Sequence, residues 1–210
     1  MRISKEHFKA AVPAVIVMAL FAVSAYFSQR YGERLNVFVE GGGFFGMIVY
    51  VFIAIAATVV APVSAAPLIP VAASAWGVLA TGALSILGWT IGSLLAFIIG
   101  RRYGMPLVQK FVAPEKLNRL QKYIPREKAF WSVVVLRIMV PVDILSYALG
   151  IFGVLDWRRY TLATVVGISP FAFLLAYLGT LPLIYQIISI PIGLLVIFII
   201  YISGGKKFYR

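Results

Sequence analysis

The sequence predicts an all-α integral membrane protein with four transmembrane spans and two oppositely oriented re-entrant hairpins, arranged as an inverted repeat. The chain has 210 residues, of which 62% are hydrophobic and only 12% are charged, whereas about 25% are charged in soluble domains. Its mean hydropathy is +0.98. The charges leave four long blocks almost empty, namely residues 10–29, 41–100, 129–155 and 160–205. Cytoplasmic loops are rich in Lys and Arg, and the basic residues between the blocks all agree with a single membrane topology.

The first and last blocks predict ordinary spans, since a span needs about 20 apolar residues. Residues 10–28 form one anchor span, and residues 160–203 form two spans with a turn near Thr180–Pro182. A basic start followed by an apolar stretch is also typical of a cleaved signal peptide. This stretch is long for a signal peptide, which favours an uncleaved anchor.

Basic residues on both sides of block 129–155 place both of its flanks in the cytoplasm. The segment 101–128 before it is strongly basic, and Arg158 and Arg159 follow it. An even number of crossings must lie between the flanks, but two full spans would need about 40 residues. We therefore expect a hairpin that enters and leaves by one face, with its tip covered by protein or water.

Block 41–100 must bring the chain from outside to the basic cytoplasmic segment. A hairpin at 44–77 followed by a span at 79–100 fits this length. Three prolines mark the hairpin tip, because proline breaks a helix; they are Pro62, Pro67 and Pro70. A simple loop at these prolines is one alternative. Six plain spans are another, although they would put the basic segment outside.

The resulting organisation has three parts. Residues 1–43 form the anchor span and an outer connector, 44–185 the core, and 186–210 a last span with a basic tail. Both termini are cytoplasmic, and the membrane is the cell membrane. Within the core, Gly88 and Gly100 recur as Gly167 and Gly179 at a constant offset. Inverted repeats with broken helices are the design of secondary transporters, although chance similarity of two Gly-rich segments would also explain the spacing.

Arg137 is the strongest candidate for function, because a charge inside a bilayer costs about 2.5–3.5 kcal/mol on insertion scales. Asp143 follows six residues later and would face away from it in a straight helix. Pro141 breaks the helix between them and would let Asp143 fold back toward Arg137. Two simpler explanations stay open: Asp143 caps the second arm, 144–153, and Arg137 snorkels to the interface.

Other polar and aromatic residues give weaker signals. Ser64, Ser146 and Tyr147 supply hydroxyls near the two tips, where a structural role is favoured over ligand binding. Three of the four tryptophans lie near span or hairpin ends, as in an aromatic belt; the exception is Trp89. The segment 114–124 is typical of a basic amphipathic helix on the cytoplasmic surface, or of an ordinary solvated connector.

The composition also excludes several classes of function. The absence of cysteine excludes disulfides, thiolate nucleophiles and zinc–thiolate sites, and the single histidine leaves little for a metal site. Enzyme motifs such as GxSxG, HExxH and the P-loop are absent. We therefore expect neither an enzyme nor a cofactor. The net charge of +12 indicates topology and anionic lipid rather than nucleic acid.

The stretch from Leu136 to Gly150, with Arg137, Pro141 and Tyr147 in the order R-x-x-x-P…Y-x-x-G, resembles the hairpin of the DedA family. This family is also called the VTT-domain or SNARE-associated Golgi protein family. Gly100-Arg101 resembles the end of that family's preceding span, and the resemblance extends over about 44–185. It implies movement of lipids across bilayers, as in scramblases, or recycling of a polyprenyl phosphate. Many members carry acidic residues in the first hairpin, but 61–70 has none, and Glu40 is the nearest substitute.

The sequence thus favours lipid translocation through a site between the two hairpins, with Arg137 binding the phosphate head group. The expected partners are anionic phospholipid or polyprenyl phosphate; a role for protons and a homo-oligomer are compatible with the sequence. A proton-coupled carrier for a small polar solute is the first alternative, with Asp143 as the titrating acid. A membrane-protein insertion or assembly factor is the second.

Overall fold

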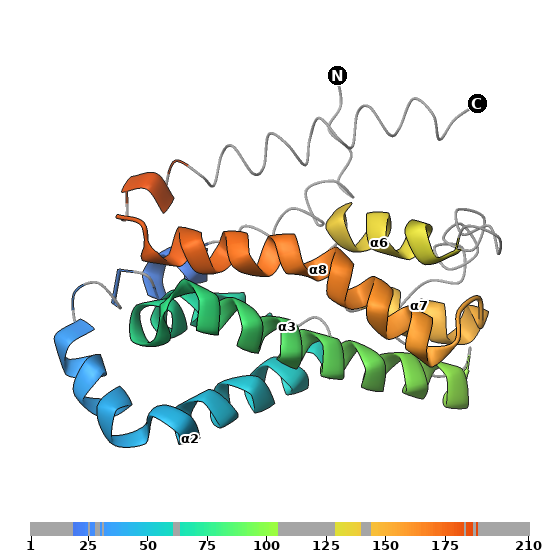
Figure 1. The fold of residues 1–210 in the computed structure, drawn as a ribbon, viewed down its shortest axis with the longest axis horizontal. Coiled ribbons are helices and arrows are strands. Elements are labelled where there is room, and N and C mark those ends of the chain that lie inside the picture. Colours follow the sequence, from blue (N-terminus) through green and yellow to red (C-terminus); the bar gives the residue numbers. More distant parts are fainter. Residues whose placement is uncertain are drawn as a thin grey trace.

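The computed structural model describes residues 19–24, 26–27, 30, 32–60, 64–104, 129–139, 144–182, 184–186 and 188. This part of the chain is helical and contains no strand, which confirms the predicted all-α class. Its main elements are, in chain order, α2 (Gly32–Val59), the short 3₁₀ helix η1 (Ala66–Leu68), α3 (Ile69–Tyr103), α6 (Ala129–Met139), α7 (Ile144–Phe152) and α8 (Trp157–Thr180). Figure 1 shows α3 and α8 side by side, with α2 on one flank of α3.

A single glycine breaks α3 into a short and a long part. Gly77 has φ 79° and ψ 169° inside the helix, a conformation that a residue with a Cβ rarely adopts. The sequence predicted that the first hairpin ends at this residue, and the break lies there. In the same way Gly153, with φ 57°, follows the end of α7.

The short part of α3 runs back along α2. The ring of Trp76 meets the ring of Tyr50 edge-on at 5.8 Å, whereas Ala65, at the other end of the segment, belongs to one buried cluster with Ala54. The later residue of the segment 64–76 thus meets the earlier residue of α2, and the earlier one meets the later. The segment is therefore antiparallel to α2. The chain between α2 and Gly77 therefore forms a helical hairpin.

The long part of α3 runs parallel to α2 and is in close contact with it. A Cβ added to Gly88 would lie 2.7 Å from the Cβ of Ala54, and one added to Gly92 would lie 2.7 Å from that of Thr58. Glycine at these two positions lets the helix backbones approach closely, as in other GxxxG faces.

The second half of the chain repeats this arrangement. Gly167 on α8 lies against Arg137 on α6, as Gly88 on α3 lies against Ala54 on α2. In both pairs the glycine also meets the carbonyl oxygen three residues before its partner. The glycines of the sequence repeat thus make matching contacts.

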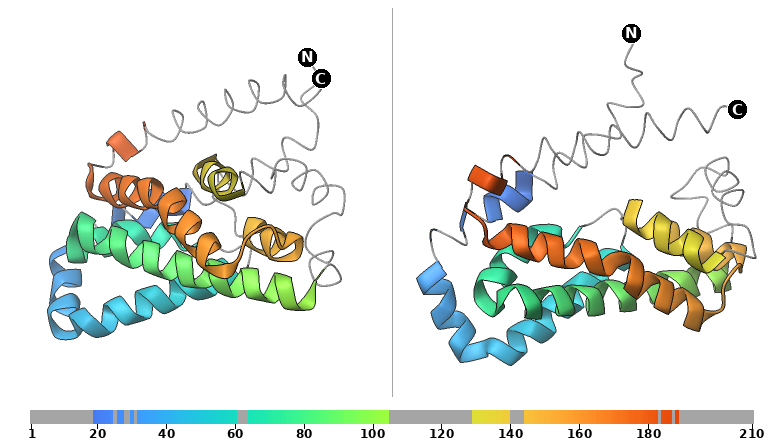
Figure 2. Two further views of the ribbon diagram at one scale, coloured as in Figure 1. Left: turned by 45° about the vertical axis from the view of Figure 1, so that its right-hand side comes forward. Right: turned by 45° about the horizontal axis from the view of Figure 1, so that its top comes forward.

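The other two repeat glycines connect the halves to each other. Gly100 of α3 lies against the backbone of Tyr147 in α7, and Gly179 of α8 lies against the backbone of Pro70 in α3. The two long helices are antiparallel. Gly82 of α3 meets Phe173 of α8, whereas Phe97, later in α3, stacks on Tyr160, earlier in α8. Figure 2 shows them crossing in both further views. This exchange of contacts is the arrangement that an inverted repeat requires.

The predicted spans are tested only in part. Two helical segments, Ala66–Tyr103 and Trp157–Thr180, are long and apolar enough to cross a membrane; they contain the predicted spans 79–100 and 160–179. Helix α2 begins at Gly32, so most of the expected outer connector is helical. The last span, the segment 114–124 and most of the first span lie outside the described residues, as do Pro62, Pro141 and Asp143.

Candidate functional site

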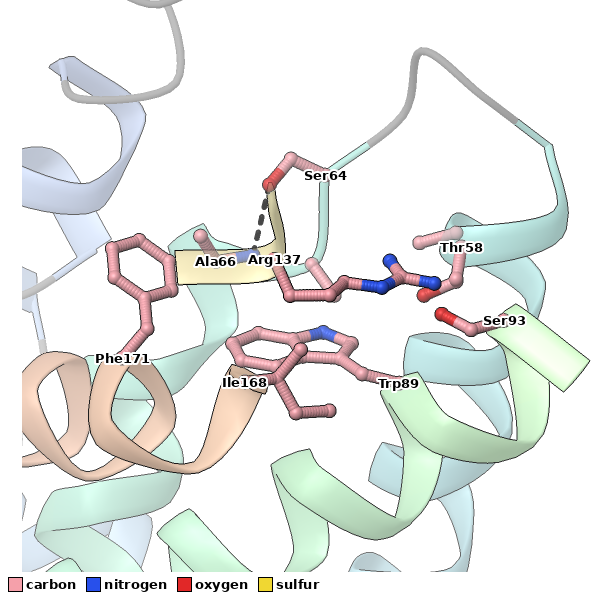
Figure 3. A pocket seen from close by; sticks show the side chains of 10 residues that line it. Thr58, Ser64, Ala66, Trp89, Ser93, Arg137, Ile168 and Phe171 are labelled. Atoms are coloured by element: carbon pink, nitrogen blue, oxygen red, sulfur yellow. Dashed lines mark hydrogen bonds between the residues drawn. The ribbon is translucent and has the colours of Figure 1, made fainter. Parts of the chain in front are cut away.

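A cavity of about 80 Å³ lies where the two halves meet. Its lining comes from α2, η1 and the residues before it, α3, α6 and α8, and consists of Ala57, Thr58, Ser64, Ala65, Ala66, Trp89, Ser93, Arg137, Ile168 and Phe171. Figure 3 shows the Arg137 side chain extending across this space toward Thr58 and Ser93. The volume is several times the minimum of about 10–15 Å³ that one water molecule needs.

Arg137 is buried, with only 3% of its surface exposed. Its terminal Nη2 donates to the hydroxyl of Ser146 at 2.7 Å and to the hydroxyl of Tyr160 at 2.5 Å. These contacts show that the side chain points into the protein, so it does not snorkel to the surface. The predicted site residues Arg137 and Ser146 are therefore brought together by the fold.

Tyr160 connects the arginine to the long helix of the other half. Its hydroxyl donates to the backbone oxygen of Ser93 at 3.1 Å, so it must act as acceptor toward Arg137. Its ring is fully buried and stacks on Phe97, with centroids 4.2 Å apart. One side chain thus connects α6, α8 and α3 around the guanidinium group.

The cavity contains the positive charge of Arg137. Both hydrogen-bond partners of Arg137 among the described residues are neutral hydroxyls, and no acidic side chain of that part lines the cavity. The Nε atom of Arg137 is buried and has no hydrogen-bond partner there. Because a buried charge needs compensation, the guanidinium group requires a negative partner that the described residues do not supply.

The cavity lies near the middle of α3. Ser93 is about 15 Å along the helix axis from Tyr103 and about 24 Å from Gly77, at 1.5 Å per residue. The shorter distance equals about half the thickness of a hydrocarbon core, which is about 30 Å.

Of the remaining predicted site residues whose side chains the structure describes, Ser64 lines the cavity and the others do not. Tyr147 donates to the backbone oxygen of Val59 at 2.6 Å, so it connects the second hairpin to the end of α2. Gly150 lies against the backbone of Phe97. Pro67 lies in η1 and Pro70 in the first turn of α3, so both begin helical turns.

Arg101 does not reach the cavity. It is exposed at the end of α3, with its guanidinium carbon 6.0 Å from the ring centre of Phe97. The structure describes only the backbone of Glu40, and Pro62, Pro141 and Asp143 lie outside the described residues. The expected pairing of Asp143 with Arg137 and the expected helix cap at Asp143 therefore stay predictions.

Sequence reasoning missed Thr58, Trp89 and Ser93, which line the cavity, and Tyr160, which accepts a hydrogen bond from Arg137. Tyr160 stands next to a pair of arginines at a predicted span end, where an aromatic residue indicates an interface anchor. Thr58 and Ser93 are single hydroxyl residues within apolar blocks. Only their polarity inside such a block could have indicated a buried site.

The fold and the site define the class: a helical membrane protein whose two repeat-related halves enclose a buried arginine. A family model for the VTT domain matches residues 62–181, more than half of the chain. The protein belongs to this family, the DedA or SNARE-associated Golgi protein family, as its sequence indicated. The search of curated proteins found no match, and the search of solved structures found none.

Proposed function

We propose that this protein moves lipids across the membrane, with Arg137 binding the phosphate of the head group. The observation that carries the proposal is the buried guanidinium at the meeting point of the two halves, with its Nε atom lacking a partner among the described residues. Members of this family are often proposed to be transporters or lipid flippases, which supports the same class of activity.

The chemistry of arginine suits a phosphate ligand. Its planar guanidinium group donates two parallel hydrogen bonds to a phosphate, and such charge-assisted bonds are about twice as strong as neutral ones. Both protons of Nη2 are donated to the hydroxyls of Ser146 and Tyr160, which hold the group in one orientation. A phosphate at the Nε edge would accept from Nε and replace one of these hydroxyls at Nη2, which completes the two parallel bonds and compensates the buried charge.

The proposed membrane arrangement follows the topology that the sequence predicts. The pairs α2 with 64–76 and α6 with α7 are re-entrant hairpins from opposite faces, α3 beyond Gly77 and α8 are spans, and further spans lie at each end. Both termini face the cytoplasm. In this arrangement the cavity lies near the bilayer midplane, where transporters with inverted repeats hold their substrates. Acyl tails would stay in lipid while only the head group enters, a process that needs no catalytic residue or cofactor.

A flux experiment in liposomes tests the proposal. Purified protein is placed in vesicles that carry, in both leaflets, phosphatidylcholine with a fluorophore on one acyl chain, so that its head group is intact, and a membrane-impermeant reductant bleaches the outer leaflet. Wild type, Arg137→Ala and Asp143→Asn are compared, each with and without a pH gradient. Protein-free vesicles give the baseline, at which bleaching stops near half.

We expect wild type to bleach well beyond half, Arg137→Ala to stay near the baseline, and the pH gradient to change neither. Flux that appears only with a gradient and disappears in Asp143→Asn would replace scrambling by the proton-coupled carrier. If bleaching stops at half in every sample, the proposal is wrong for this lipid. A vesicle series with a polyprenyl phosphate and a client-binding assay would then separate that substrate from the assembly role.

A further inference from the structure

The cavity has two chemically different sides. Arg137, Ser64 and the hydroxyl residues of α2 and α3 make one side polar, whereas Trp89 and Phe171 place aromatic rings on the other. The two ring centres are 6.4 Å apart, with an angle of 32° between their planes. Figure 3 shows the indole ring of Trp89 lying beneath the Arg137 side chain, along the floor of the cavity.

An aromatic floor is not required by an anion site alone. The guanidinium group and the hydroxyl groups can bind a phosphate without the face of an aromatic ring. Trp89 is also the one tryptophan that the sequence leaves away from any predicted span or hairpin end, so an interfacial anchor does not explain it. The side chain of Trp89 is partly exposed although it lies in the middle of α3, and it borders the cavity.

We propose that Trp89 is a specificity-determining residue, which binds the ammonium group of a zwitterionic phospholipid while Arg137 binds its phosphate. Tryptophan is the strongest aromatic partner for a cation, and the attraction increases when the cation loses its water. In the described residues that line the cavity, the ring faces of Trp89 and Phe171 are the groups that attract a cation. The inference rests on the proposed function, since it assigns the substrate class of the same site.

The geometry separates the two charges of such a head group. The guanidinium carbon of Arg137 approaches the ring of Tyr160, at 5.7 Å from its centre, and its Nη2 is held there by the tyrosine hydroxyl. The arginine therefore occupies the Tyr160 ring and leaves the Trp89 ring to another cation. Choline and ethanolamine both offer one, whereas a glycerol head group offers none.

Binding and flux are measured separately to test this inference. Short-chain phosphatidylcholine, phosphatidylethanolamine and phosphatidylglycerol are titrated into detergent-purified protein by calorimetry, with wild type, Trp89→Phe and Trp89→Leu. Trp131→Leu is the matched control, because Trp131 is 65% exposed and does not line the cavity. The same variants are then assayed for flux of the three labelled lipids.

We expect wild type and Trp131→Leu to bind the two ammonium lipids about tenfold more tightly than phosphatidylglycerol. Trp89→Phe keeps part of this preference, and Trp89→Leu abolishes it while binding of phosphatidylglycerol is unchanged. Equal affinities for all three lipids in wild type would overturn the inference, as would a uniform loss in Trp89→Leu, which indicates a packing role. Head-group preference in binding without any flux would instead contradict the proposed translocation, and flux without preference would contradict only the role of Trp89.

Discussion

The two halves of the core share a scaffold but differ in their chemistry. Gly88 and Gly167 occupy matching places on the two long helices. Each lies against a side chain of the first helix of its half, which is α2 or α6. In the first half that side chain is Ala54; in the second it is Arg137. The comparison teaches that close glycine packing builds the frame in both halves, whereas the side chain that meets the glycine is charged in one half and apolar in the other. Four predictions test how far this equivalence extends.

The largest effect is expected where the halves exchange contacts. A Cβ at Gly100 would collide with the backbone oxygen of Tyr147, whereas one at Gly179 would lie 2.9 Å from the Cα of Pro70. Gly100→Ala should therefore lower the free energy of unfolding by about 3 kcal/mol or more, and Gly179→Ala by about 1–2 kcal/mol. Thermal unfolding in detergent, followed by circular dichroism, measures both.

Gly43→Ala is the control for both substitutions, because nothing lies within 4 Å of the Cβ it would add. It should leave stability unchanged or raise it slightly, since alanine is the better helix former. Equal losses in Gly100→Ala and Gly179→Ala would mean that the two crossings tolerate a methyl group equally well.

The next effect compares the glycine contacts inside each half. The added Cβ would lie 2.7 Å from the Cβ of Ala54 in Gly88→Ala and 2.5 Å from that of Arg137 in Gly167→Ala. Each should cost about 1–3 kcal/mol of stability. Only Gly167→Ala should also weaken lipid binding, because it displaces the arginine. If titration with a short-chain lipid finds both variants weakened alike, the division between frame and binding group fails.

Tyr160→Phe should have an effect of similar size that is specific to the second half. It removes the hydroxyl that accepts from Arg137 and donates to Ser93, and a hydrogen bond to a charged group contributes about 1.5–3 kcal/mol. Stability and lipid affinity should both fall, with the ring stack on Phe97 retained. Tyr177→Phe, at an exposed position of the same helix, should change neither quantity.

Tyr147→Phe should have the smallest effect. It removes the bond to the backbone oxygen of Val59, which contributes about 1 kcal/mol. Its packing counterpart in the first half is Pro70, whose side chain has no hydroxyl and cannot make the same bond. Chemical denaturation of the variant measures the loss, and a loss above about 3 kcal/mol would show that the ring rather than the hydroxyl holds the two hairpins together.

Sequence reasoning succeeded where one residue determines the local structure. The breaks at Gly77 and after α7 were predicted, because only glycine tolerates their positive φ. The end of α8 at Thr180 and the burial of Arg137 were also predicted, from proline and from the charge-free block around the arginine. The helical start of α2 was missed. A stretch that is not apolar indicates that the chain has left the membrane, but it does not show whether the chain is helical there.

The site itself could be predicted only in part. Arg137 and Ser146 were both predicted as site residues, but the partner predicted for the arginine was Asp143 and not Ser146. Tyr160 and Ser93 come from separate long helices, and only the crossing of α3 and α8 brings them to the arginine. Spacing along one chain contains no signal for such a contact, because the crossing point depends on the packing of small residues over both helices.

The central claim is that the forked guanidinium of Arg137 carries the lipid phosphate, and a charge-conserving substitution tests it most directly. Flux of labelled phosphatidylcholine is measured in vesicles with wild type, Arg137→Lys and Arg159→Lys; Arg159 is 74% exposed and pairs only weakly with Asp156. Lysine keeps the charge but cannot form the two parallel bonds. The account predicts that Arg137→Lys slows flux by about tenfold or more while Arg159→Lys equals wild type. Wild-type flux in Arg137→Lys would contradict it.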